Sequence, residues 1–91
     1  MNDGEKTKEE LVSDLMKHVR MLIYGRYYPD NKRLAVERYM RSYLRALTLG
    51  ELRAYINLFK RRGILQPDVV HKVDQASEGY DNFMRKRGIP Y

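Results

Sequence analysis

The chain contains no cysteine, and it has only three prolines among its 91 residues. The lack of cysteine excludes disulfides, thiolate metal sites and thiol catalysis. Without such cross-links, a domain of this length depends for its stability on helix packing or on a second copy of itself. The sequence also lacks a glycine-rich phosphate loop and a dinucleotide-binding fingerprint. We therefore expect a non-enzymatic protein with no cofactor, no metal and no small-molecule substrate.

Long hydrophobic runs are also missing. No apolar run approaches the roughly 18 residues that are needed to span a bilayer, so no membrane association is expected. The first ten residues, MNDGEKTKEE, are acidic and polar, which is unlike a signal peptide. A cytoplasmic location is the resulting expectation. Hydrophobic residues make up 43% of the chain and charged residues 33%, which is typical of a folded domain.

Acidic residues are scarce in the middle of the chain. The formal net charge is +6, and it is unevenly distributed along the sequence. Residues 1–15 carry two lysines and five acidic residues, whereas residues 16–63 carry twelve basic residues and three acidic ones. Residues 64–91 are balanced, with four of each sign. This distribution predicts that the basic side chains gather on one part of the surface and are not spread uniformly over it.

Hydrophobic periodicity predicts one helical domain over residues 1–91, with a disordered tail over 1–6. Capping boxes at Thr7 and Thr48, a glycine at position 63 and a proline at position 67 mark the ends of helices. The four expected helices cover residues 8–24, 32–46, 49–62 and 67–86. The predicted fold class is all-α, a small antiparallel or orthogonal four-helix bundle. A C-terminal αα-hairpin is expected around residues 63–66.

Each expected helix has one apolar face. The face of helix 8–24 consists of Leu11, Val12, Leu15, Met16, Val19, Leu22 and Ile23. The face of helix 32–46, with the residue after it, consists of Val36, Met40, Tyr43 and Leu47, flanked by Tyr39 and Leu44. The face of helix 49–62 consists of Leu49, Leu52, Tyr55, Ile56 and Phe59, and that of helix 67–86 of Val69, Val70, Val73, Ala76, Tyr80, Phe83 and Met84. Gly79 lies inside the last helix, where it costs about 1 kcal/mol relative to alanine. We interpret it as a close approach to another helix or a mild kink.

The stretch 24–47 concentrates tyrosine and arginine. Tyrosine and arginine are typical of interface anchors, because they bury much area while keeping a polar tip. The predicted partner-binding residues are Tyr24, Tyr27, Tyr28, Arg38, Arg41 and Arg45. An equally weighted alternative is that Tyr27 and Tyr28 fold back as a lid over one end of the bundle.

The basic side of residues 32–62 could instead follow phosphates, with nearby tyrosines stacking on unpaired bases. The candidate nucleic-acid contacts are Lys32, Arg33, Arg53, Lys60 and Arg61. The simpler alternative is a solvated face on which Glu37 pairs with Arg41, four residues later.

Two further patterns have structural interpretations. Asp74, Glu78 and Asp81 form an acidic ridge that could face the arginines of 32–46 or 49–62, within one chain or across a symmetric dimer. A solvated acidic face is the simpler alternative. His18 borders the apolar face of 8–24, so we expect a partly buried structural histidine.

Two functional hypotheses follow from these observations. The first is a small helical interaction or regulatory module that binds a protein partner, or itself as a homodimer, through the Tyr/Arg-rich surface. The second is sequence-nonspecific binding of RNA or single-stranded DNA along the basic side. A steep loss of affinity with salt would favour the second.

Overall fold

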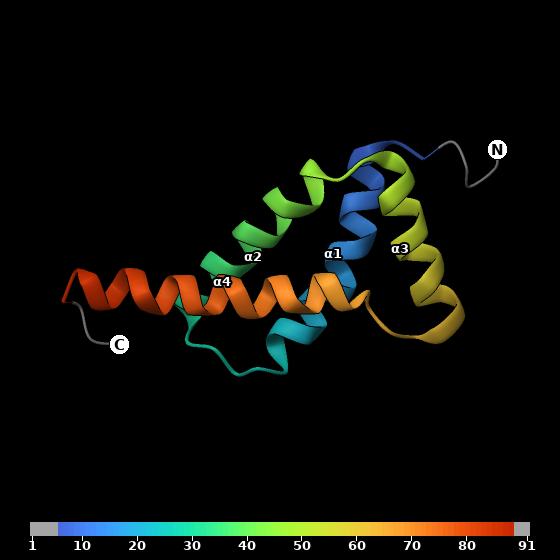
Figure 1. The fold of residues 1–91 in the computed structure, drawn as a ribbon. Helices are drawn as coiled ribbons and strands as arrows, with labels where there is room; N and C mark the ends of the chain where they lie inside the picture. The colour runs from blue at the N-terminus through green and yellow to red at the C-terminus, as the bar shows by residue number, and fades with distance from the viewer. Residues whose placement is uncertain (1–5, 89–91) are drawn as a thin grey trace.

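The computed structural model describes residues 6–88, which form four helices and no strand. These are α1 (Lys8–Tyr24), α2 (Asp30–Ala46), α3 (Leu49–Arg62) and α4 (Pro67–Lys86), as Figure 1 shows. The all-α, four-helix fold class is confirmed, and three of the helices have the predicted bounds. Residues 1–5 of the expected tail lie outside the described residues. Lys6 does not belong to a free tail, because its ammonium lies 2.9 Å from Asp14.

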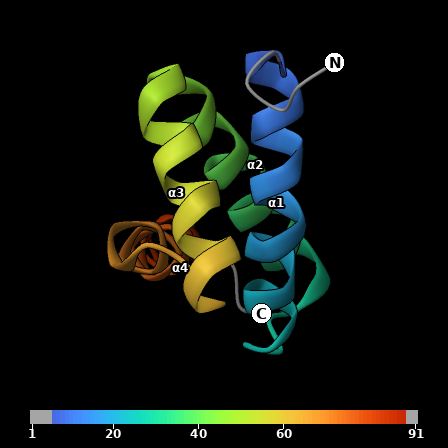
Figure 2. The ribbon, with the colours of Figure 1, turned by 90° about the vertical axis from the view of Figure 1, so that its right-hand side faces the viewer.

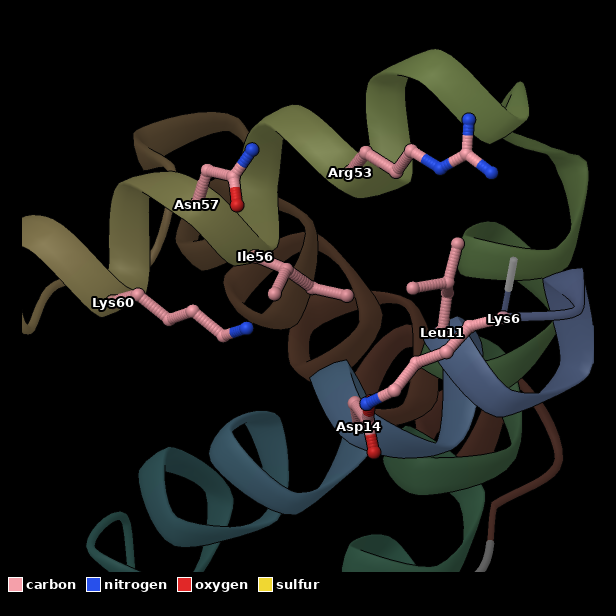
Figure 3. Close-up of a pocket in the computed structure, with 7 residues that line it drawn as sticks. All are labelled: Lys6, Leu11, Asp14, Arg53, Ile56, Asn57 and Lys60. Carbon is pink, nitrogen blue, oxygen red and sulfur yellow. The ribbon is translucent and has the colours of Figure 1, made fainter. Parts of the chain in front are cut away.

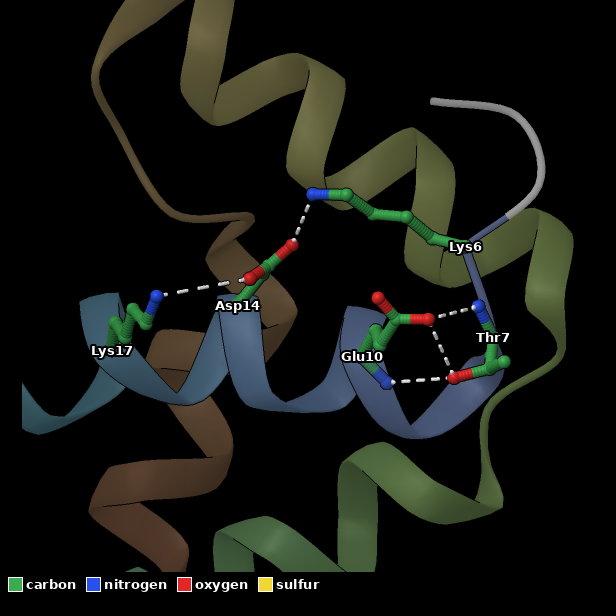
Figure 4. A network of polar contacts seen from close by, with 5 residues as sticks. All are labelled: Lys6, Thr7, Glu10, Asp14 and Lys17. Atoms are coloured by element: carbon green, nitrogen blue, oxygen red, sulfur yellow. Dashed lines mark hydrogen bonds and ion pairs between the residues drawn. The ribbon is translucent and has the colours of Figure 1, made fainter. Parts of the chain in front are cut away.

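Both capping boxes are present. The Thr7 hydroxyl accepts a hydrogen bond from the Glu10 backbone N–H at 3.2 Å, and the Glu10 carboxylate accepts one from the Thr7 N–H at 3.1 Å (Figure 4). Thr48 and Glu51 repeat this pattern at the start of α3. Gly63 ends α3 with φ +67°, a left-handed conformation that glycine adopts without steric cost. Local sequence therefore determines where α1 and α3 begin and where α3 ends.

The start of α2 differs from the prediction by two residues. The helix begins at Asp30, and the carbonyl of Pro29 accepts the Arg33 N–H at 2.8 Å. Neither Asp30 nor Asn31 acts as the cap. Pro29 lies in an extended conformation at the N-cap, so the helix begins immediately after it, and Asp30 in the first turn suits the positive end of the helix dipole.

Helix α1 packs against both α2 and α3, while α4 packs mainly against α2. In Figure 2, α4 is seen end-on while α1 and α3 run from top to bottom of the picture, so α4 crosses these helices. Residues 63–66 join α3 to α4, where the C-terminal αα-hairpin was expected. The two helices follow one another through residues 63–66 but diverge, which is the orthogonal form of the predicted bundle.

The core lies where α1 meets the other helices. Its fully or almost fully buried hydrophobic residues are Leu11, Val12, Leu15, Met16, Val19, Ile23, Val36, Met40, Leu44, Leu52, Val69, Val73 and Ala76. Every residue of the α1 stripe belongs to this cluster or packs against it. In α4 the buried part of the stripe lies in the first half of the helix, because Phe83 in the second half is 54% exposed. Leu44, expected to flank the core, belongs to it, whereas Leu49 and Tyr39 are exposed.

The molecule is elongated for its length. Its radius of gyration is 14.4 Å and its principal extents are 51 × 22 × 19 Å. A compact domain of this size would have a radius of gyration of about 12 Å. The difference comes from α4, whose C-terminal half extends past the other three helices in Figure 1.

Candidate interaction surfaces

The three tyrosines at the turn between α1 and α2 have different environments. Tyr28 is half-buried against the core, and the Lys32 ammonium lies 4.7 Å from its ring centroid. Tyr24 is 54% exposed and Arg33 stacks over its ring at 5.4 Å. Tyr27 is 90% exposed. The lid interpretation therefore describes Tyr28 and does not describe Tyr27.

Tyr27 also has unusual backbone geometry. Its φ is +57°, in the left-handed region that non-glycine residues seldom occupy. The turn is fixed on both sides, since the N–H groups of Arg26 and Tyr27 donate to the carbonyls of Ile23 and Tyr24. Such conformations persist where the surrounding structure holds them, and they concentrate at binding sites. The turn thus presents an exposed tyrosine at a defined position.

The arginines of α2 separate into paired and unpaired groups. Glu37 pairs with Arg20 of α1 at 3.2 Å and with Arg33 at 2.9 Å, and not with Arg41 as the spacing suggested. Arg45 reaches Glu9 at 3.3 Å. Within residues 6–88, Arg38 and Arg41 form no ion pair. These two guanidinium groups are therefore available to a partner.

Two exposed apolar residues, one on α1 and one on α2, were missed by sequence analysis. Met21 is 70% exposed and Leu34 is 52% exposed. Leu34 lies four and seven residues before Arg38 and Arg41, so the three share one side of α2. Both apolar residues fall off the core stripe of their own helix, which is the signal that could have identified them. We define the α1–α2 face as Met21, Tyr24, Tyr27, Leu34, Arg38 and Arg41.

The candidate nucleic-acid contacts do not form one surface. Lys32 is only 9% exposed, and its ammonium lies 2.9 Å from Asp81. It therefore does not contribute to an exposed basic surface. Arg33 is engaged by Glu37 and Asp30. Arg61 is exposed at the end of α3. Arg53 and Lys60 line a common pocket between α1 and α3.

That pocket has a volume of about 160 Å³, and Figure 3 shows its walls. Lys6, Arg53 and Lys60 supply three cations, while Leu11 and Ile56 supply apolar surface. Asp14 also lines it and forms ion pairs with Lys6 and, more loosely, with Lys17 at 4.0 Å (Figure 4). The pocket therefore has an excess of positive charge.

The acidic ridge of α4 finds partners within the same chain. Asp81 pairs with buried Lys32 of α2, and Asp74 lies 3.4 Å from Arg26 in the turn before α2. Glu78 is exposed. These pairs attach α4 to the start of α2. The partners differ from the arginines of α2 or α3 that were expected.

The histidines have structural environments. His18 is half-buried and stacks on Phe59 with ring centroids 3.7 Å apart, which confirms the predicted structural role. His71 is exposed and its Nε2 lies 3.1 Å from the Gln75 amide. No group of three or more His, Asp or Glu side chains in residues 6–88 is arranged to hold a metal ion.

Two side chains have shifted pKa values. Burial, followed by the neighbouring Tyr55 phenol, raises the pKa of Tyr43 above its ordinary value of 10.0. Hydrogen bonds from the backbone and hydroxyl of Thr48 lower the pKa of Glu51 below 4.5. The Glu51 carboxylate therefore stabilises the fold above pH 4.5, and this contribution is lost as the pH falls through its lower folded pKa. Neither shift lies on the α1–α2 face.

The chain was compared with protein-family models, with curated protein sequences and with solved structures. None of them matches. None of the helices in the described part of the chain is sufficiently long and apolar to span a membrane.

Proposed function

We propose that this protein is a non-enzymatic helical module that binds an acidic partner protein through the α1–α2 face. The observation that carries the proposal is the exposure of Met21, Tyr24, Tyr27 and Leu34 on α1, α2 and the turn between them, together with two arginines of α2 that form no ion pair within residues 6–88. Tyrosine, methionine and arginine are enriched at protein interfaces relative to other surface residues. Each of these four side chains is more than half exposed.

The charges of the face favour a different protein over a second copy. In a two-fold dimer the same patch meets itself, so Arg38 and Arg41 of both copies would approach one another. Like charges at an interface oppose association, whereas carboxylates of an acidic partner would pair with these guanidinium groups. Tyr27 adds an anchor whose backbone is already fixed by the turn, which lowers the entropy lost on binding.

Site-specific photo-crosslinking tests this proposal. A benzoylphenylalanine replaces Tyr27 in one sample and Arg61, which is exposed on α3, in the control. We expect a discrete crosslinked protein with the label at position 27 and none at position 61. A quadruple variant, Tyr24→Ala, Leu34→Ala, Arg38→Ala and Arg41→Ala, should abolish the crosslink while retaining helical circular dichroism. Equal crosslinking from positions 27 and 61 would contradict the assignment.

Binding of RNA or single-stranded DNA is the second candidate. It is supported by the pocket between α1 and α3, which Lys6, Arg53 and Lys60 line. Fluorescence anisotropy with an oligo(dT) strand across a salt series tests it. Contact with three phosphates would give a slope of about −2 in a plot of log affinity against log salt. Lys60→Ala should reduce that slope, and a flat salt response would exclude this candidate.

A further inference from the structure

A second apolar surface lies on the other side of α2 and is independent of the α1–α2 face. It is a groove of about 360 Å³ between α2 and α4. Ala35 and Tyr39 line it from α2, and Ala76, Gly79 and Phe83 line it from α4. Tyr39 is 44% exposed and Phe83 is 54% exposed, so aromatic rings on both walls are uncovered. The groove is the continuation of the α4 apolar stripe past the end of the core.

Gly79 is the unusual residue in this groove. A glycine inside a helix destabilises it by roughly 0.5–1 kcal/mol relative to alanine. The expected reason was a close approach to another helix or a mild kink, but a Cβ added at this position meets nothing within 4 Å. No described part of the chain requires the glycine. Together with Ala35 and Ala76, it forms a floor of small residues that allows another backbone to approach closely.

Three basic side chains lie near the groove, namely Lys72, Lys86 and Arg87. Arg87 stacks over the Phe83 ring at 5.2 Å, and the Lys72 ammonium lies 5.5 Å from the Tyr43 ring. Lys86 lies on the groove side of α4, because it follows Phe83 by three residues and Gly79 by seven. Asp74 and Asp81 of α4 lie on the opposite side, where they pair with Arg26 and Lys32, whereas Asp68 in the first turn of α4 lies near Tyr43.

We infer that this groove binds an amphipathic helix of another protein, which presents apolar anchors to the groove and acidic residues to its rim. Placing the apolar face of a helix in a hydrophobic groove is a recurring mode of recognition. A second copy of this chain fits poorly, because its own α4 ends with Arg85 and Lys86 and is followed by Arg87. Those cations would meet the basic rim, whereas glutamates of an acidic helix would pair with it.

Two synthetic helical peptides with the same leucine face test the inference. One peptide has glutamates on both sides of the leucines and the other has lysines. Fluorescence anisotropy measures the binding of each to the full chain. We expect the glutamate peptide to bind about tenfold or more tightly than the lysine peptide. Equal affinity for both peptides, or no binding of the glutamate peptide, would overturn the inference.

Variants locate the binding site. Gly79→Leu places an apolar side chain in the groove at a position where its Cβ meets nothing within 4 Å, and it should weaken binding of the glutamate peptide by about tenfold or more. Lys86→Glu with Arg87→Glu should reverse the peptide preference. The matched control, Arg61→Glu with Arg62→Glu, makes the same charge change at the exposed end of α3 and should leave the ratio of the two affinities almost unchanged. Thermal unfolding confirms that each variant is folded.

Two further measurements separate this inference from other possibilities. The Leu34→Ala, Arg41→Ala variant of the α1–α2 face should bind the glutamate peptide like the unmodified protein, so the two proposals can fail separately. Light scattering reports whether the protein associates with itself. A dimer that Gly79→Leu abolishes would show that the groove binds a second copy, and would overturn the assignment of an acidic partner helix.

Discussion

Helices α1 and α4 both have a continuous apolar stripe, but the fold covers them differently. In α1, Leu15, Met16, Val19 and Ile23 are completely buried, because α2 and α3 pack on it. In α4, Val69 and Val73 are equally buried, whereas Phe83 is more than half exposed. A stripe of apolar residues therefore predicts a helix with one apolar face that another surface can cover. It does not specify whether the same chain or another molecule covers that side.

Core substitutions should give the largest difference between the two helices. Leu15→Ala removes a completely buried side chain and should lower the free energy of unfolding by about 3 kcal/mol. Phe83→Ala, at an exposed position, should lower it by only about 0.5 kcal/mol. Urea denaturation of both variants measures this contrast. Similar losses would mean that Phe83 is buried in the protein as it exists in solution.

The ion pairs of α4 should follow with a smaller effect. Asp81→Ala leaves the buried Lys32 ammonium without its carboxylate and should cost about 2 kcal/mol. Asp74→Ala breaks the more exposed pair with Arg26 and should cost about 0.5 kcal/mol. Chemical denaturation at neutral pH compares the two variants. If Asp74→Ala is the more damaging change, Arg26 and not Lys32 attaches α4 to the bundle.

The N-terminal caps of α1 and α4 provide a third comparison. Thr7→Ala removes the side chain that accepts the Glu10 N–H, and should lower stability by about 1 kcal/mol. Gln66 precedes α4 without a side-chain cap, so Gln66→Ala should have almost no effect on stability. Thermal unfolding monitored by circular dichroism distinguishes the two. A large loss of stability in Gln66→Ala would show that the Gln66 side chain stabilises the start of α4 through a contact other than a cap.

Gly79→Ala should change stability least, and in the opposite direction. Because the new methyl group meets nothing within 4 Å, the variant should gain roughly 0.5–1 kcal/mol from the better helix propensity of alanine. Ser77→Ala, inside the same helix, is a control for substitutions that introduce alanine. A loss of stability in Gly79→Ala would indicate that another element approaches this position closely.

Local signals predicted the helices of this protein accurately. The capping boxes at Thr7 and Thr48, the left-handed Gly63 and Pro67 act within one or two turns, so the sequence alone is sufficient to recognise them. Long-range packing was harder to predict. The crossing of α4 over α2 and the pairing of Lys32 with Asp81, 49 residues apart, depend on the whole fold. The exposure of Met21 and Leu34 and the open groove at Gly79 likewise depend on which faces the helices leave uncovered.

Hydrogen exchange along α4, followed residue by residue by NMR, tests most directly whether its stripe is covered unequally. Amides in the well-packed first half, around Val73 and Ala76, should be strongly protected because they open only with the core. Amides after Tyr80 should exchange much faster, and the glutamate peptide should slow them. Uniform protection along the whole of α4, in a sample that light scattering shows to be monomeric, would contradict the open groove.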